Sequence, residues 1–269
     1  MSSRLLFFSV FILAGCAILY ELLLASALSY LLGATILYFS LTIGVFLFAL
    51  GVGAWLSKKI GESLLKKFLI LEIALGILGG LSLPLIFSLY ASSFQTLHEL
   101  FPQNIIGFLF FSGRLEITFQ IISFATIFAI GTLVGIELPV FTRLVNRSMV
   151  LKEALAQVFF WDYLGALTGS ILFPLFLLPK LGFLQTGFLV GILNLGAVLI
   201  LALATQGLNL GATLSLRAKI ILTLGLLTLS AGFIFSPNIE RFFTQNIFAA
   251  QEILISKSSP YQNIILTQN

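Results

Sequence analysis

Residues 162–174 read Asp-Tyr-Leu-Gly-Ala-Leu-Thr-Gly-Ser-Ile-Leu-Phe-Pro, in which a carboxylic acid and several small residues interrupt a long apolar run. The chain of 269 residues around this stretch is 59% hydrophobic and only 9% charged, and its mean hydropathy is +1.13. Soluble domains carry about 25% charged residues, so this composition indicates that lipid is the solvent. A carboxylate is costly in hydrocarbon, and an acid in such a run therefore needs a partner or a ligand.

Apolar runs of about 20 residues, the length that crosses a bilayer as a helix, recur along the chain. They lack the alternating polarity of barrel strands, so we expect an all-α, polytopic transmembrane bundle of about seven helices, with eight as the alternative. Loops rich in Lys and Arg follow the second, fourth and sixth spans, which places the amino terminus in the cytoplasm by the positive-inside rule. The expected spans are 5–32, 36–56, 68–91, 115–141, 155–178, 183–204 and 220–235.

The chain is expected to divide into a transmembrane helical domain (1–236), an amphipathic linker helix (237–257) and the first strand of a truncated domain (258–269). Apolar residues spaced among polar ones after Phe235 are typical of a helix that lies on a membrane surface. The final segment has the pattern of a turn and a short strand, which has no strand left to pair with. We therefore expect the chain to stop where a second domain begins.

Acidic residues inside the expected spans are the candidates for a functional site. We interpret Glu21, Glu137 and Asp162, with the neighbouring Tyr20 and Tyr163, as a polar pocket that binds a cationic substrate. The alternative is that these carboxyl groups only hydrogen-bond neighbouring helices.

Two other acids, Glu72 and Glu116, are interpreted as interfacial because they lie nearer the ends of their spans. In the segment 135–139, Pro139 is expected to interrupt its helix beside Glu137 and free a carbonyl group there.

Other sequence features exclude several classes of function. The single cysteine and single histidine leave no set of residues for a thiolate cluster or a His-rich metal site. No basic stripe with interleaved aromatic residues indicates nucleic-acid binding, and no phosphate-binding or metalloprotease motif occurs. Pairs of glycines four residues apart, as at 165 and 169, predict close packing between helices. A homo-oligomer is also expected.

Several motifs together resemble the membrane-embedded amino-terminal region of bacterial spermidine synthase-like proteins, which are polyamine aminopropyltransferases. The resemblance covers most of residues 1–200 and continues in the tail, where Ser-Pro-Tyr-Gln-Asn-Ile at 259–264 is similar to the strand that opens the transferase domain. The other matching segments are 20–22, 40–53, Glu72 with 79–82, 135–139, 162–174 and 179–182.

The resemblance implies a bacterial inner-membrane protein of polyamine biosynthesis whose soluble domain uses decarboxylated S-adenosylmethionine, with Gln262 contributing to that site. The glycine-rich nucleotide-binding domain of the family has no counterpart in these residues, so we expect no transferase activity from this chain alone. The leading hypothesis is a membrane domain that anchors the enzyme and binds or passes polyamine through its acid-lined interior. The alternatives are a small transporter for an organic cation and a ligand-free membrane scaffold.

Overall fold

The structure is a computed structural model that describes residues 3–61, 63–100, 105–147, 149–206, 214–247, 252–258 and 263–268. Long α-helices account for most of these residues, which confirms the predicted helical class. A 3₁₀ helix, η1 (Ser57–Lys59), follows α2, and a π-helix, η2 (Phe173–Leu177), joins α5 to α6. The α-helices are α1 (Ser3–Leu32), α2 (Thr35–Leu56), α3 (Leu64–Leu100), α4 (Ile105–Val145), α5 (Leu151–Leu172), α6 (Leu178–Gln206) and α7 (Leu216–Ile247).

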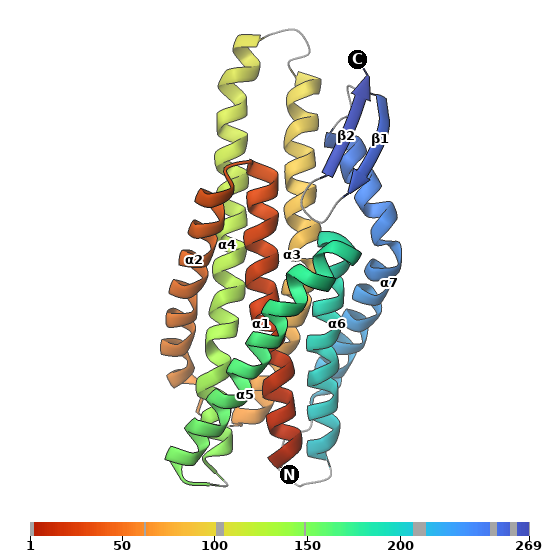
Figure 1. Ribbon diagram of the computed structural model, residues 1–269. Helices are drawn as coiled ribbons and strands as arrows, with labels where there is room; N and C mark the ends of the chain where they lie inside the picture. The colour runs from red at the N-terminus through yellow and green to blue at the C-terminus, as the bar shows by residue number, and fades with distance from the viewer. Residues whose placement is uncertain are drawn as a thin grey trace.

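Successive helices run in alternating directions along the bundle, and the two chain termini lie at opposite ends (Figure 1). The main packing partners are α2 with α4, α1 with α5, and α3 with α6. Glycines allow these helices to approach closely: a Cβ atom added at Gly165 in α5 would collide with the backbone of Phe11 in α1. In the same way, the backbones of Gly80 in α3 and Gly191 in α6 meet directly. The glycine pairs therefore serve helix packing, as their spacing predicted.

The chain reverses direction between α5 and α6 at Gly182, whose φ of 72° and ψ of −173° are not helical. Residues with a side chain rarely adopt this conformation, which glycine tolerates. The Thr186 hydroxyl donates a hydrogen bond to the Gly182 carbonyl oxygen at 2.6 Å. The helix α5 and the main part of α6 consequently run in opposite directions as two legs of a hairpin (Figure 1).

Six helical stretches in the described residues are long and apolar enough to cross a membrane, whereas the sequence predicted about seven spans. The difference lies in Leu151–Leu203, a stretch of 53 residues that contains both predicted spans 155–178 and 183–204. The predicted break between these two spans is present at Gly182, whose backbone is not helical, and the π-helix joins α5 to the short helical segment before it. This stretch is about twice the length that a single bilayer span requires.

The predicted linker helix over 237–257 does not form as a separate element. Its first part extends α7 to Ile247, and its last part belongs to strand β1 (Glu252–Ser258). The helix continues through Pro237, which lacks the N–H that would bond to the Phe233 carbonyl oxygen; the Ser236 hydroxyl donates to this oxygen instead, at 2.8 Å.

The last predicted strand also differs from expectation, because it has a partner. Strand β2 (Asn263–Gln268) pairs antiparallel with β1, and an irregularity in register lies between Ile253 and Ile255. The sequence pattern had identified β2 and missed β1, which had been assigned to the linker helix. The proposed division into domains remains a prediction.

The ends of α2 and α4 and the start of α7, which carry or adjoin basic residues, lie at the same end of the bundle as the amino terminus (Figure 1). The Arg143 guanidinium group near the end of α4 donates hydrogen bonds to the carbonyl oxygens of Ser57 at 2.7 Å and Ile60 at 2.8 Å. The Lys58 ammonium group lies 4.0 Å from the centre of the Trp55 ring. These contacts link α4 to the turn after α2 and place two positive charges at this end of the bundle.

Candidate functional site

A pocket of about 400 Å³ lies between α1, α2, α4 and α5. It forms where two closely packed helix pairs, α1 with α5 and α2 with α4, face each other. The pocket wall is largely apolar, with three acidic side chains among its lining. Its apolar lining includes Ala14, Ala17, Ile18, Phe46, Leu50 and Val134.

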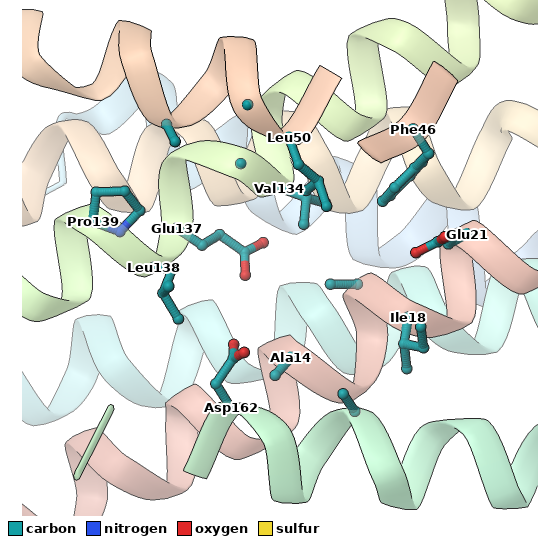
Figure 2. Close-up of a pocket in the computed structure, with 15 residues that line it drawn as sticks. Ala14, Ile18, Glu21, Phe46, Leu50, Val134, Glu137, Leu138, Pro139 and Asp162 are labelled. Carbon is teal, nitrogen blue, oxygen red and sulfur yellow. The ribbon is translucent and has the colours of Figure 1, made fainter. Parts of the chain in front are cut away.

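Figure 2 shows that the carboxyl groups of Glu21, Glu137 and Asp162 point into this pocket from α1, α4 and α5. Glu137 is 6% exposed, and the other two side chains are partly buried. None of the three forms an ion pair with a Lys or Arg in the part of the chain that the structure describes. Negative groups of this kind, set in an apolar wall without a positive partner, favour the binding of a cation.

The Pro139 ring also lines the pocket, one helical turn beyond Gly135. The expected interruption of the helix at this proline is absent, since α4 continues through it to Val145. The helix α4 packs against α2 and α3. The carboxyl group of Glu137 is therefore positioned by an intact helix.

A second group of polar side chains lies deeper in the bundle, behind Glu137. The Glu137 carboxyl group is within hydrogen-bonding reach of the Glu72 carboxyl group in α3. The Asn194 amide in α6 donates a hydrogen bond to Glu72 Oε2 at 3.2 Å. Tyr20 and Cys16 of α1 lie close enough to influence both acids electrostatically. Four helices thus contribute to one buried polar cluster.

Several oxygen atoms in this cluster have no hydrogen-bonding partner among the described residues. They are Glu137 Oε1, Asn194 Oδ1 and Tyr20 Oη. The three side chains are 6%, 0% and 1% exposed, respectively. An unpartnered buried polar atom destabilises the folded state by about 1–3 kcal/mol, so these atoms mark a place that favours an additional polar species.

The two tyrosines predicted beside the acids do not line the pocket. Tyr20 turns away from Glu21 into the buried cluster, whereas Tyr163 is 67% exposed on the outside of α5 and stacks on Phe159. Adjacent residues on an α-helix point about 100° apart, so the neighbour of a pocket-lining acid faces another direction. The prediction of Tyr163 as a pocket ligand is therefore wrong, and Gln262 lies outside the described residues.

Glu72 was misplaced by the sequence analysis, and Asn194 was missed. Glu72 lies two turns into α3, but α4 and α6 cover it there and leave it 1% exposed, so the interfacial interpretation is wrong. An amide within the apolar run 183–204 was the signal that could have identified Asn194.

Glu116 is exposed and accepts a hydrogen bond from Gln120 Nε2 at 3.2 Å. No group of three metal-binding side chains occurs within the described ranges.

Fold and site together define the class of protein: a bundle of long apolar helices that encloses a pocket lined by carboxyl groups. Proteins named polyamine aminopropyltransferase are similar to this chain over nearly its entire length, which supports that family. The protein of this name from Leptospira interrogans is 40% identical over 98% of this chain, a match that covers 47% of the relative. Polyamine aminopropyltransferase 2 of Ralstonia nicotianae is 35% identical over 99% of the chain and 48% of its own length.

A third relative, polyamine aminopropyltransferase 1 of Streptomyces coelicolor, is 31% identical over 98% of this chain and 46% of its own length. The chain therefore spans about half the length of the curated relatives that it matches. No family model and no solved structure matched the chain.

These comparisons correct the functional hypothesis drawn from the sequence. That hypothesis treated the chain as only a membrane domain beside an absent enzyme, with a transporter or a scaffold as alternatives. The similarity to proteins named polyamine aminopropyltransferase extends over 98% of the chain, so the comparison supports that family for the chain as a whole and not a separate transporter or scaffold.

Proposed function

We propose that this chain forms part of a polyamine aminopropyltransferase and that its carboxyl-lined pocket binds the amine substrate. The observation that carries the proposal is the convergence of Glu21, Glu137 and Asp162 on one pocket (Figure 2). The similarity to proteins of that name supports the substrate class.

A polyamine has the chemical features that this pocket would recognise. It consists of methylene segments separated by ammonium groups, and ammonium groups are attracted strongly to carboxylates in a low-dielectric site. The apolar wall contacts the methylene groups, while the three acids from α1, α4 and α5 accept hydrogen bonds from the nitrogen atoms. A substrate with a single ammonium group would satisfy fewer of these acids and bind more weakly.

The proposal also places the protein in the bacterial cytoplasmic membrane as a multi-pass protein, with the lipid bilayer as its partner. Six long apolar stretches support this location, as do large exposed side chains such as Ile36 and Phe48, which are 85% and 67% accessible. The ends of α2 and α4 and the start of α7, where basic residues gather, share the end of the bundle that holds the amino terminus, which favours a cytoplasmic position for that end. A homo-oligomer remains a prediction.

Decarboxylated S-adenosylmethionine is the proposed aminopropyl donor. Its assignment rests on the resemblance of residues 259–264 to the family, with Gln262 as the residue implied to contact it. The cavity between α1, α2, α4 and α5 is assigned to the amine, because its three acids match the several ammonium groups of a polyamine.

The amine assignment is tested by equilibrium binding of radiolabelled spermidine to the purified chain in detergent. We expect saturable binding that Asp162→Asn weakens at least about tenfold, because the variant loses a charge facing the ligand. The matched control is Glu116→Gln, which removes an exposed carboxylate from α4 away from the pocket. Absence of saturable binding to the wild type, or unchanged binding to Asp162→Asn, would reject the assignment.

A further inference from the structure

We propose that Glu72 and Glu137 form a proton-binding site that gives up its proton when a cation enters the neighbouring pocket. The inference rests on the proposed function, because it takes the pocket to be the amine site. It adds a second site, occupied by a proton, and a coupling between the two.

The first argument is the contact between the two carboxyl groups. Both side chains are nearly fully buried, at 1% and 6% exposure, and they lie within hydrogen-bonding reach of each other. A hydrogen bond between two carboxyl groups requires a proton on one of them, because an ionised carboxylate only accepts. Two ionised carboxylates at this separation would also repel each other strongly in a buried site.

The second argument concerns the groups that surround the pair. The Asn194 amide of α6 donates to Glu72, while Tyr20 and Cys16 face the pair from α1 and Asp162 faces Glu137 from α5. None of these groups is a cation, and neither acid forms an ion pair with a Lys or Arg anywhere in the described ranges. When the pocket holds no cation, a proton shared by Glu72 and Glu137 is therefore the positive charge that offsets their repulsion.

The third argument is that Glu137 belongs to both sites. It lines the pocket with Asp162 and Glu21, and it contacts Glu72 on its other side. Its Oε1 atom has no hydrogen-bonding partner in the part of the chain that the structure describes. An ammonium group bound to this oxygen would supply the charge that the proton supplied before.

The exchange balances in charge and atoms. One ammonium group takes the place of one proton, which leaves Glu72 or Glu137 for water in the pocket, while the other ammonium groups of spermidine bring their charge to Glu21 and Asp162. Because binding releases a proton, the affinity for spermidine should rise with pH by up to about tenfold per unit while the pair is protonated. A pocket whose acids are already ionised would show no such dependence.

The test is isothermal titration of spermidine into the wild-type chain in two buffers that differ in ionisation enthalpy. We expect the difference in heat to report release of about one proton per bound spermidine. In Glu72→Gln, the new amide can donate to an ionised Glu137, so we expect spermidine to bind while the release falls close to zero. Glu116→Gln on the same helix as Glu137 should release as much as the wild type.

The outcomes separate this inference from the proposed function. Binding to the wild type without proton release overturns the inference and leaves the amine site in place. Release that persists in Glu72→Gln would assign the proton to Asp162 or Glu21 and also overturn it. No binding to the wild type rejects both proposals, and if Glu72→Gln fails to fold, the wild-type measurement in two buffers still decides.

Discussion

The side-chain amide of Asn194 in α6 donates a hydrogen bond of 3.2 Å to the carboxyl group of Glu72 in α3. Both side chains are almost completely buried, at 0% and 1% exposure. Gly76, one turn beyond Glu72, makes room for this contact, because a Cβ atom there would lie 2.5 Å from Asn194 Oδ1. The contact therefore joins two helices at the centre of the bundle and orients the acid that meets Glu137.

Replacing Asn194 with Leu should destabilise the protein by about 1–3 kcal/mol, because the variant leaves the Glu72 carboxyl group buried without its donor. The unfolding midpoint can be followed with a thiol-reactive fluorophore, since Cys16 is the single cysteine and is only 2% exposed. Asn238→Leu on the exposed part of α7 is the matched control and should change the midpoint little. Equal midpoints for the two variants would contradict the structural role of the Asn194 contact.

Gly53 in α2 lies directly against the backbone of α4, where an added Cβ atom would be 2.9 Å from the Cα atom of Gly135. Gly53→Ala should therefore force α2 and α4 apart and lower the unfolding midpoint, at a cost of about 1–3 kcal/mol for overpacking. Gly51→Ala two residues earlier meets open space, and the better helix propensity of alanine should leave it neutral or more stable. Equal losses of stability in the two variants would contradict the close approach of α2 and α4 at Gly53.

The turn between α5 and α6 depends on the positive φ of Gly182. We expect Gly182→Ala to cost about 1–3 kcal/mol, because alanine must adopt a strained backbone conformation there, although its Cβ atom would make only ordinary contact with the Glu240 carboxyl group at 3.9 Å. Gly196→Ala, in the regular part of α6 and facing open space, is the control that should not be destabilised. A Gly182→Ala protein as stable as the control would show that the turn has another conformation.

Sequence periodicity and composition predicted the helical class well, because helices in a chain this apolar are defined by the length of their runs. They failed where local hydrogen bonding decides the outcome. Pro237 reads as a helix end, but the Ser236 hydroxyl replaces the bond that the proline removes, and α7 continues. By contrast, the predicted gap between the spans that end at 178 and begin at 183 is confirmed, because the backbone at Gly182 is not helical and the chain reverses direction there.

For the site, the sequence identified the three acids that line the pocket but not the buried cluster behind them. An acid can be recognised within an apolar run, which is how Glu21, Glu137 and Asp162 were found. The residue next to such an acid points about 100° away on the helix, and Tyr163, which follows Asp162, therefore faces outward. The burial of Glu72 depends on helices distant in the sequence, and only the structure shows that they cover it.

Arg143 links the end of α4 to the turn after α2 through two carbonyl groups, those of Ser57 and Ile60. Arg143→Lys keeps the charge but cannot reproduce the two-pronged donation, so we expect a loss of about 1–3 kcal/mol. The same replacement at the exposed Arg147 should have no measurable effect on the unfolding midpoint. A destabilised Arg147→Lys together with a stable Arg143→Lys would run against this account.

The most direct test of the amine site is an experimental structure of the chain with spermidine bound. The account predicts an elongated ligand between α1, α4 and α5, with its nitrogen atoms within hydrogen-bonding distance of the carboxyl groups of Glu137 and Asp162. Spermidine bound at another place while these acids face an empty pocket at saturating concentration would contradict it.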